Sequence, residues 1–191
     1  MAQQIEIEYK TLLSPEAYQK IFDHYQLTTH PFTQQTNSYF DTSDQQLKKR
    51  RWGLRIRRFD NAGELTLKCP TGNIGLLEIT DYLSIEEADQ LIQEQRILTD
   101  GEVAQQLKKQ MIPLHQLQLI AELTTKRYEL ELPIGLLALD HSWYNGQEDY
   151  ELELEVQEEV QGKAAFFELL EMLNIPYQKA ENKIVRALKV K

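Results

Sequence analysis

Polar and apolar residues alternate along most of this chain, and this period-two pattern constrains the fold more than any other feature of the sequence. The first instance is IEIEYK, in which Glu6, Glu8 and Lys10 occupy every second position between apolar residues. Because successive side chains of a β-strand point to opposite faces, such a segment predicts a strand with one charged and one apolar face. A chain built from such segments is predicted to form amphipathic β-sheet.

The alternation returns in further segments, which are separated by short turns or by stretches with helical periodicity. Strands are predicted at residues 35–42, 52–59, 63–69, 76–83, 117–125, 126–133, 135–143 and 149–157. Helices are predicted at residues 14–25, 84–92, 101–112, 162–173 and 182–190. Sequential antiparallel strands with peripheral helices indicate an α+β fold. About eight strands in one sheet can remove their unpaired edges by closing into a barrel.

Length and composition indicate one globular domain over residues 1–191. The single cysteine, Cys69, belongs to no CxxC or Cys/His cluster, which favours a reducing compartment and argues against a structural zinc site. The N-terminus lacks the pattern of a signal peptide, and no apolar run reaches the length of a membrane span, so we expect a cytoplasmic protein. A net charge of -9 disfavours nucleic acid or membrane partners. Whether the chain is a monomer or a homodimer stays open.

Closure of the sheet would decide which way the charged faces point. The predicted helices are amphipathic and need an apolar surface to cover, so the apolar strand faces are expected outside, beneath the helices. The charged faces would then line the interior, whereas ordinary small barrels fill it with apolar side chains. The basic residues on these faces are Lys10, Arg55, Arg57, Lys68 and Arg127, and the acidic ones include Glu6, Glu8, Glu153 and Glu155.

So many charges in a confined interior indicate a site for a highly charged ligand, because burying unpaired ions costs several kcal/mol each. Arginine and lysine suit phosphate oxygens. Clustered carboxylates would repel a phosphate unless a divalent cation lies between them, and Mg²⁺ or Mn²⁺ is the usual bridge. Both signs together therefore indicate a metal-bound polyphosphate.

Several motifs together resemble those of the CYTH superfamily, the triphosphate tunnel metalloenzymes. The residues of these motifs are most similar to those of the small stand-alone members of low-GC Gram-positive bacteria. The N-terminal ExExK signature is complete in IEIEYK. The other matching elements are LRIR with Arg55 and Arg57, LTLK with Lys68, KRYEL with Arg127, LALD with Asp140, and ELE with Glu153 and Glu155. ExExK alone is a weak signal, but six elements in the family's order are a strong one.

The resemblance implies an eight-stranded antiparallel barrel, or tunnel, with a charged interior. It implies that metal is held by Glu6, Glu8, Asp140, Glu153 and Glu155. It implies that triphosphate is bound by Lys10, Arg55, Arg57, Lys68, Arg127 and Lys183. Of these residues, Glu6, Glu8 and Lys10 are expected to be catalytic.

Three assignments leave alternatives. The late motif is ELELE, so the acidic pair is either Glu153 with Glu155 or Glu151 with Glu153, and we favour the former because it directly precedes the end of the strand. Arg186, one helical turn after Lys183, is the rival for the C-terminal basic residue. Glu78 either supports the metal or forms a plain salt bridge to an inward arginine.

The function expected from these residues is a Mg²⁺- or Mn²⁺-dependent triphosphatase that releases the terminal phosphate. One cation would bridge the substrate to the acidic residues, and a second cation or a glutamate would activate the attacking water. The first alternative is a class IV-type adenylate cyclase, which converts ATP into cyclic AMP and pyrophosphate. The second is a polyphosphate- or nucleotide-binding module without catalysis.

Overall fold

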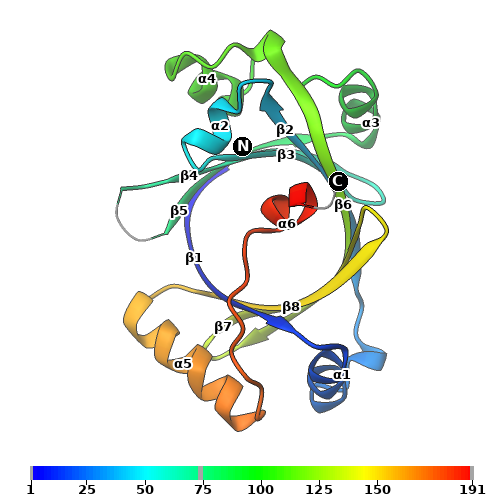
Figure 1. The fold of residues 1–191 in the computed structure, drawn as a ribbon, viewed down its shortest axis with the longest axis vertical. Coiled ribbons are helices and arrows are strands. Elements are labelled where there is room, and N and C mark those ends of the chain that lie inside the picture. The colour runs from blue at the N-terminus through cyan, green and yellow to red at the C-terminus, as the bar shows by residue number, and fades with distance from the viewer. Residues whose placement is uncertain (1, 73–74, 190–191) are drawn as a thin grey trace. The chain divides into compact units, whose positions relative to one another are not determined.

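Eight antiparallel strands form a closed barrel in the order β1-β5-β4-β3-β2-β6-β7-β8 (Figure 1). This computed structural model describes residues 2–72 and 75–189. The strands are β1 (Ala2–Leu13), β2 (Thr33–Thr42), β3 (Gly53–Arg58), β4 (Gly63–Pro70), β5 (Leu76–Leu83), β6 (Leu117–Leu132), β7 (Gly135–Tyr144) and β8 (Gln147–Val156). The predicted α+β class and the closed eight-stranded barrel are therefore confirmed.

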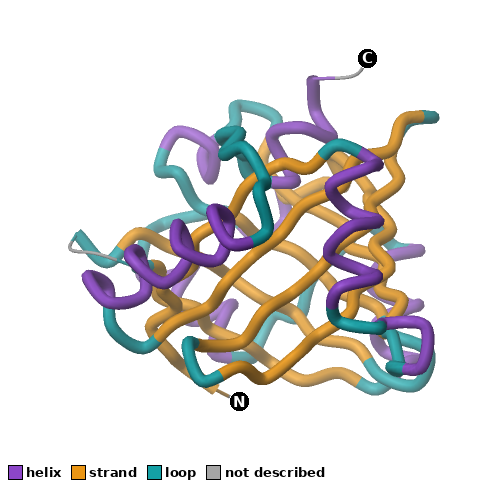
Figure 2. The backbone as a smooth tube through the Cα atoms, turned by 90° about the horizontal axis from the view of Figure 1, so that it is seen from below, coloured by secondary structure: helices purple, strands orange, loops and turns teal. Residues whose placement is uncertain are grey.

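In the part of the chain that the structure describes, six helices and two 3-10 turns accompany the strands, and Figure 2 shows the helices in purple beside the strands in orange. They are α1 (Pro15–His24), η1 (Leu27–Thr29), α2 (Gln46–Lys49), α3 (Ile85–Gln93), α4 (Glu102–Lys109), η2 (Leu114–Gln116), α5 (Glu159–Met172) and α6 (Lys183–Lys189). The sequence predicted α1, α3, α4, α5 and α6 but not the three shortest elements. Within the described residues, no helix has both the length and the hydrophobicity that crossing a bilayer requires.

The chain divides into two compact units, which are described separately. Unit 1 comprises Met1–Ile5, Gln35–Leu123 and Lys183–Lys191, and unit 2 comprises Glu6–Gln34 and Thr124–Asn182. Strands β1 and β6 each contribute residues to both units.

The core of unit 1 lies between the apolar faces of β3 and β4 and the helices α3 and α4. Leu54, Ile56, Leu65 and Leu67 are fully buried there. They share this core with Ala88 of α3 and with Val103 and Leu107 of α4. The buried carboxylate of Asp81 accepts hydrogen bonds from the backbone N–H groups of Glu102 and Val103, both at 3.0 Å, and so caps the start of α4. The remaining face of β3 and β4 carries Arg55, Arg57, Glu64 and Lys68.

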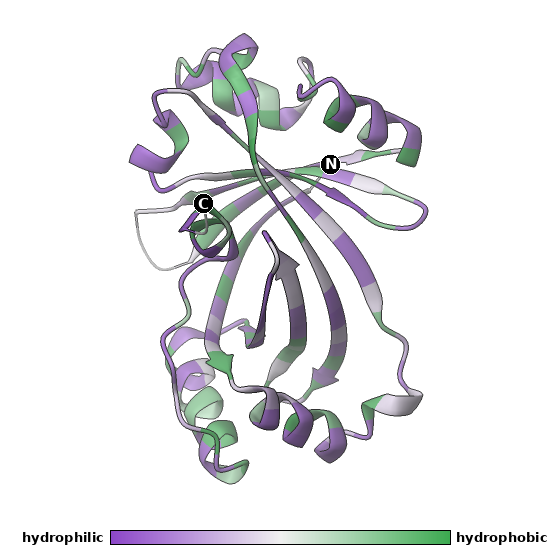
Figure 3. Ribbon diagram, turned by 45° about the vertical axis from the view of Figure 1, so that its right-hand side comes forward, coloured by the Kyte–Doolittle hydropathy of each residue, from purple (hydrophilic) through white to green (hydrophobic). Residues whose placement is uncertain are grey.

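The core of unit 2 has the same construction on β7 and β8. Leu139, Leu152 and Leu154 are buried beneath Phe166 of α5 and Ile21 of α1. Figure 3 shows the result as hydrophilic and hydrophobic bands that alternate along the strands. In both units the apolar strand faces pack against helices, as the sequence predicted.

Strand β6 differs from the prediction of two strands at 117–125 and 126–133, which is wrong. The structure has one strand, Leu117–Leu132. The apolar residues that pack into the cores occupy odd positions at Leu117 and Leu119 but even positions at Tyr128 and Leu130. This change of phase resembles a strand boundary in sequence, but no turn residue interrupts the chain between the two halves.

Candidate functional site

The acidic face of unit 2 is built on β8 and its two neighbours. Glu151, Glu153 and Glu155 alternate with core residues and therefore project to the same face of β8. On β1, Lys10 lies opposite Glu153, and Glu8 lies opposite Glu155. The Lys10 Nζ is 2.5 Å from a carboxylate oxygen of Glu8. The ExExK motif and the late glutamates, which are far apart in sequence, are thus neighbours in the sheet.

Arg127 of β6 joins this face from the opposite side. Asp140 of β7 lies opposite both Arg127 and Glu151 in the strand register. The Arg127 guanidinium donates two hydrogen bonds to Asp140, from Nε at 2.7 Å and from Nη2 at 2.6 Å. The same Nη2 donates to Glu153 at 2.5 Å, and Nη1 is 3.7 Å from Glu129. One guanidinium therefore contacts three carboxylates.

Burial alone would lower the pKa of Arg127, but the negative charges of Asp140 and Glu153 outweigh burial and hold it well above its ordinary value. Asp140 is fully buried, and Glu153 is 9% exposed. The guanidinium therefore stays charged and neutralises carboxylates that have little access to water.

A cavity opens on this acidic face within unit 2. Its lining consists of Glu6, Glu8, Arg127, Glu129, Leu136, Ala138, Glu153 and Glu155. Five of the predicted site residues of this unit therefore border one cavity. Lys10 and Asp140 are adjacent to that lining, through Glu8 and Arg127 respectively.

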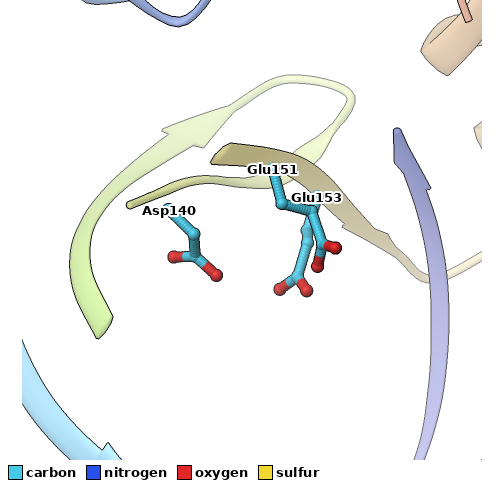
Figure 4. A group of neighbouring side chains, drawn as sticks. All are labelled: Asp140, Glu151 and Glu153. Atoms are coloured by element: carbon cyan, nitrogen blue, oxygen red, sulfur yellow. The ribbon is translucent and has the colours of Figure 1, made fainter. Parts of the chain in front are cut away.

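Three carboxylates of this face have a geometry that suits a cation. Asp140, Glu151 and Glu153 each offer an oxygen atom, and these atoms lie within 4.8 Å of one another. Figure 4 shows Asp140 on β7 and the two glutamates on β8, with their carboxylates projecting from the same side of the two strands. A set of carboxylate oxygens is the donor set that Mg²⁺ and Mn²⁺ prefer.

The basic face of unit 1 lies on β3 and β4. Arg55 and Arg57 occupy alternate positions of β3, opposite Thr66 and Glu64 of β4, and Lys68 lies two positions beyond Thr66. All three basic residues are on the face that points away from the buried core of unit 1. The predicted phosphate-binding residues of this unit therefore share one surface.

Two of these basic side chains are held by polar partners from neighbouring strands. Arg57 donates from Nε to the amide oxygen of Asn37 at 3.2 Å, and its Nη1 is 3.0 Å from a carboxylate oxygen of Glu64. The Lys68 Nζ is 2.9 Å from a carboxylate oxygen of Glu78. Glu78 therefore forms a salt bridge, with a lysine as its partner.

The environment of Glu78 changes its acidity. Burial acts to raise the pKa of this carboxyl, but nearby positive charges outweigh burial and hold the pKa below its ordinary value of 4.5. These charges belong to Lys68, Arg55 and Arg57. Folding therefore stabilises the ionised form of Glu78, which is the form present at neutral pH.

We expect Glu78→Gln to be less stable than the parent at pH 7, by about 1–3 kcal/mol, because Lys68 loses a charged hydrogen-bond partner. Since the folded pKa is depressed, the stabilisation by Glu78 is complete above pH 4.5 and is lost as the pH falls through the folded pKa. Urea unfolding between pH 7 and pH 3 measures the difference. The exposed Glu168→Gln is the matched control. A difference that stays constant down to pH 3 would contradict the assignment.

Helix α6 carries both C-terminal candidates in unit 1. Lys183 is its first residue, and Arg186, which is 8% exposed, lies one turn later. The choice between them as the residue that binds substrate stays a prediction.

Sequence reasoning did not assign Asn37, Glu64 and Glu129 to the site, and it kept Glu151 only as an alternative. The signal for Glu64 was its position in the same period-two phase as Lys68, and the signal for Glu129 was its place two residues after Arg127. For Asn37 the only signal was its position within the family-like segment NSYFDT. The contacts of Asn37, Glu64 and Glu151 depend on which residue of the next strand lies opposite, which a single segment does not encode.

Known proteins share both the sequence pattern and the fold of this chain. The CYTH domain family model matches residues 4–188. YjbK of Bacillus subtilis, a candidate triphosphatase by its name, is 41% identical over 186 residues, which cover 97% of this chain and 95% of that protein.

Solved structures agree with this match. A protein of Bacillus halodurans described as a candidate adenylate cyclase superimposes with a TM-score of 0.91 at 40% identity, covering 97% of this chain and 98% of that one. A candidate adenylyl cyclase of Hippeastrum, HpAC1, described as having a dominant triphosphatase activity, superimposes with a TM-score of 0.81 at 21% identity. That alignment covers 98% of this chain and 97% of HpAC1, and it supports the fold alone.

Proposed function

Because the chain belongs to the CYTH family, we propose that it is a metal-dependent triphosphatase that hydrolyses the terminal phosphate of inorganic triphosphate or of an organic or nucleoside triphosphate. The observation that carries the proposal is the separation of charge between two strand faces. One face presents Arg55, Arg57 and Lys68, and the other presents the glutamates of the ExExK and ELELE motifs. Arginine and lysine suit the oxygens of a polyphosphate, and clustered carboxylates suit the divalent cation that a polyphosphate carries.

We propose that the basic side chains bind and orient the triphosphate. Arginine contacts phosphate oxygens through two parallel N–H donors, and lysine acts as a point charge. Asn37 and Glu64 fix the direction of the Arg57 guanidinium, which reduces the freedom that substrate binding has to remove. The proposed phosphate-binding residues are Lys10, Arg55, Arg57, Lys68, Arg127 and Lys183.

The proposed cation ligands are the carboxylates of the acidic face: Glu6, Glu8, Asp140, Glu153 and Glu155, with Glu151 added by its position beside Asp140. The fit rests on oxygen donors within 4.8 Å of one another and on the excess of carboxylates over basic residues on this face. A bound Mg²⁺ or Mn²⁺ would supply charge neutralisation between the carboxylates and the phosphate oxygens.

In the proposed reaction, water adds to the terminal phosphorus and the bond from this phosphorus to the bridging oxygen breaks. Pyrophosphate, or the diphosphate of an organic substrate, departs as the leaving group with the bonding electrons, and the attacked phosphoryl group becomes inorganic phosphate. We propose that Glu6 or Glu8 accepts the proton of the attacking water. Lys10, held by Glu8 at 2.5 Å, stabilises the negative charge on the transferred phosphoryl group. No covalent intermediate with the protein is required.

Adenylate cyclase activity is the second candidate, because the 40% identical Bacillus halodurans protein is described as a candidate cyclase. Both reactions can use the same residues to bind the triphosphate, but the nucleophile attacks a different phosphorus atom in each. In cyclisation the ribose 3′-hydroxyl attacks the α-phosphorus and pyrophosphate leaves.

One assay panel separates these activities. Tripolyphosphate, ATP and other nucleoside triphosphates are each incubated with Mg²⁺ or Mn²⁺, and phosphate, pyrophosphate and cyclic AMP are measured. The proposal expects inorganic phosphate from every substrate, with an equal amount of pyrophosphate from tripolyphosphate and of ADP from ATP, and no turnover when the divalent cation is chelated. Cyclic AMP as the main product from ATP would establish the second candidate. Tight cation-dependent binding without any product would indicate a binding module.

A further inference from the structure

The Arg127 guanidinium occupies the carboxylates that would otherwise face a cation. Its Nη2 lies 2.6 Å from Asp140 and 2.5 Å from Glu153, and these are two of the three residues in the group suited to a metal ion. The contact with Asp140 is bidentate, through Nε and Nη2. A positive group of the protein is therefore already present at the point where a positive ligand is expected.

The carboxylates of Asp140 and Glu153 cannot bind both the Arg127 guanidinium and a cation at full strength. Mg²⁺ binds carboxylate oxygens at about 2.0–2.1 Å and demands octahedral geometry. An oxygen that accepts a short hydrogen bond from Nη2 has less electron density to offer such an ion. Asp140 is fully buried, so its carboxylate cannot turn to water to avoid the choice.

We propose that Arg127 and the divalent cation compete for Asp140 and Glu153, so that cation binding releases the guanidinium toward the phosphates of the substrate. Arg127 then acts as an internal counter-ion in the absence of metal and as a phosphate ligand in its presence. The inference rests on the proposed function, because the released guanidinium needs a polyphosphate to bind.

The competition couples the binding of the cation to the binding of the triphosphate. When the cation is absent, Arg127 is held by carboxylates and contributes little to substrate affinity. When the cation is bound, the same side chain gains a partner in the triphosphate. By thermodynamic linkage, tripolyphosphate must then strengthen cation binding by the factor by which the cation strengthens tripolyphosphate binding.

Cation affinity without substrate tests the proposal. Mn²⁺ and Mg²⁺ are titrated by calorimetry into the parent, Arg127→Gln, Arg127→Lys and Arg57→Gln. Arg57→Gln is the matched control, since it removes one guanidinium that contacts the carboxylate of Glu64, a residue outside the candidate metal group. We expect Arg127→Gln to bind the cation at least tenfold more tightly and Arg57→Gln to stay within threefold of the parent.

The lysine variant separates competition from a general effect of charge. Arg127→Lys keeps the positive charge but loses the bidentate contact with Asp140, so competition predicts tighter cation binding in this variant as well. Unchanged affinity in Arg127→Gln would overturn the inference. Equal gains in Arg127→Gln and Arg57→Gln, with none in Arg127→Lys, would also overturn it.

A second test uses the parent protein and therefore does not depend on whether a variant folds. The side-chain Nε–Hε resonance of Arg127 is followed by NMR, with Arg127→Lys used for its assignment. The proposal expects this resonance to shift on addition of Mg²⁺ alone and again on addition of tripolyphosphate. A resonance unmoved by saturating Mg²⁺ would overturn the inference and leave the triphosphatase proposal standing. Absence of cation binding by every variant would instead contradict the metal dependence of the proposed function, and the inference with it.

Discussion

Replacing Glu8 with glutamine is expected to lower kcat/KM for tripolyphosphate by about 10²- to 10³-fold, the range that follows loss of one pre-organised charged group in an active site. Glu8 lines the cavity of unit 2, lies opposite Glu155 and contacts the Lys10 ammonium. The substitution removes a carboxylate from the proposed cation ligands, removes a proposed proton acceptor and leaves Lys10 with a weaker partner. Because glutamine has nearly the same shape, the fold should be retained.

Steady-state kinetics and calorimetric cation titration measure the two parts of this effect. Glu148→Gln is the matched control, because Glu148 also lies in unit 2 but its carboxylate is 2.8 Å from the His141 Nε2 and is more than half exposed. The control should keep parental kinetics. Full activity of Glu8→Gln with an intact fold would remove Glu8 from the catalytic assignment.

Replacing Arg57 with alanine is expected to weaken tripolyphosphate binding by about 30- to 100-fold, since charge-assisted hydrogen bonds each contribute about 1.5–3 kcal/mol. Cation affinity should change little, because the carboxylate that Arg57 contacts belongs to Glu64, which is outside the candidate metal group. This selective loss distinguishes a phosphate-binding residue from one that affects the site as a whole. Equilibrium binding of tripolyphosphate to the Ca²⁺-loaded or Mg²⁺-loaded protein measures it.

Arg58 offers a matched control one residue away. It is partly exposed, and its Nε lies 2.5 Å from Asp89 of α3, so Arg58→Ala removes the same charge from the opposite face of β3. Arg58→Ala should bind tripolyphosphate within threefold of the parent. The double variant Arg57→Ala/Glu64→Gln tests whether the unpaired Glu64 carboxylate adds repulsion, and we expect it to recover part of the lost affinity. Equal losses in Arg57→Ala and Arg58→Ala would contradict a specific phosphate contact.

The fold was predictable from sequence where the period-two pattern was unbroken. Leu54, Ile56, Leu65 and Leu67 alternate with charged or polar residues, and they are buried in the core of unit 1 as predicted. The prediction failed at β6, where the apolar residues change phase between Leu119 and Tyr128 while the backbone continues as one strand. Alternation reports the two faces of a strand but not whether a strand continues through a change of phase.

The period-two pattern predicted which charged residues share a strand face, but it did not predict the contacts between them. Glu8 and Glu155, or Lys68 and Glu78, become neighbours through the lateral register of adjacent strands. That register is determined by pairing over the whole sheet and by the turns. The same limit explains why Glu151, which lies opposite Asp140, was ranked below Glu155. The assignment of each role, the single-domain organisation, the compartment and the oligomeric state stay predictions.

The division of each strand between core and charged face has a consequence for how such a protein can change during evolution. In β4, Leu65 and Leu67 serve stability, whereas Thr66 and Lys68 lie on the charged face. Point substitutions can therefore alter the chemistry of the charged face at one set of positions while leaving the hydrophobic core at the other set intact. Deleting one residue within the strand would exchange the two sets beyond the deletion, turning leucines toward the charged face and lysine toward the helices. Lineages of this fold should accordingly accumulate substitutions within strands and confine insertions and deletions to the turns.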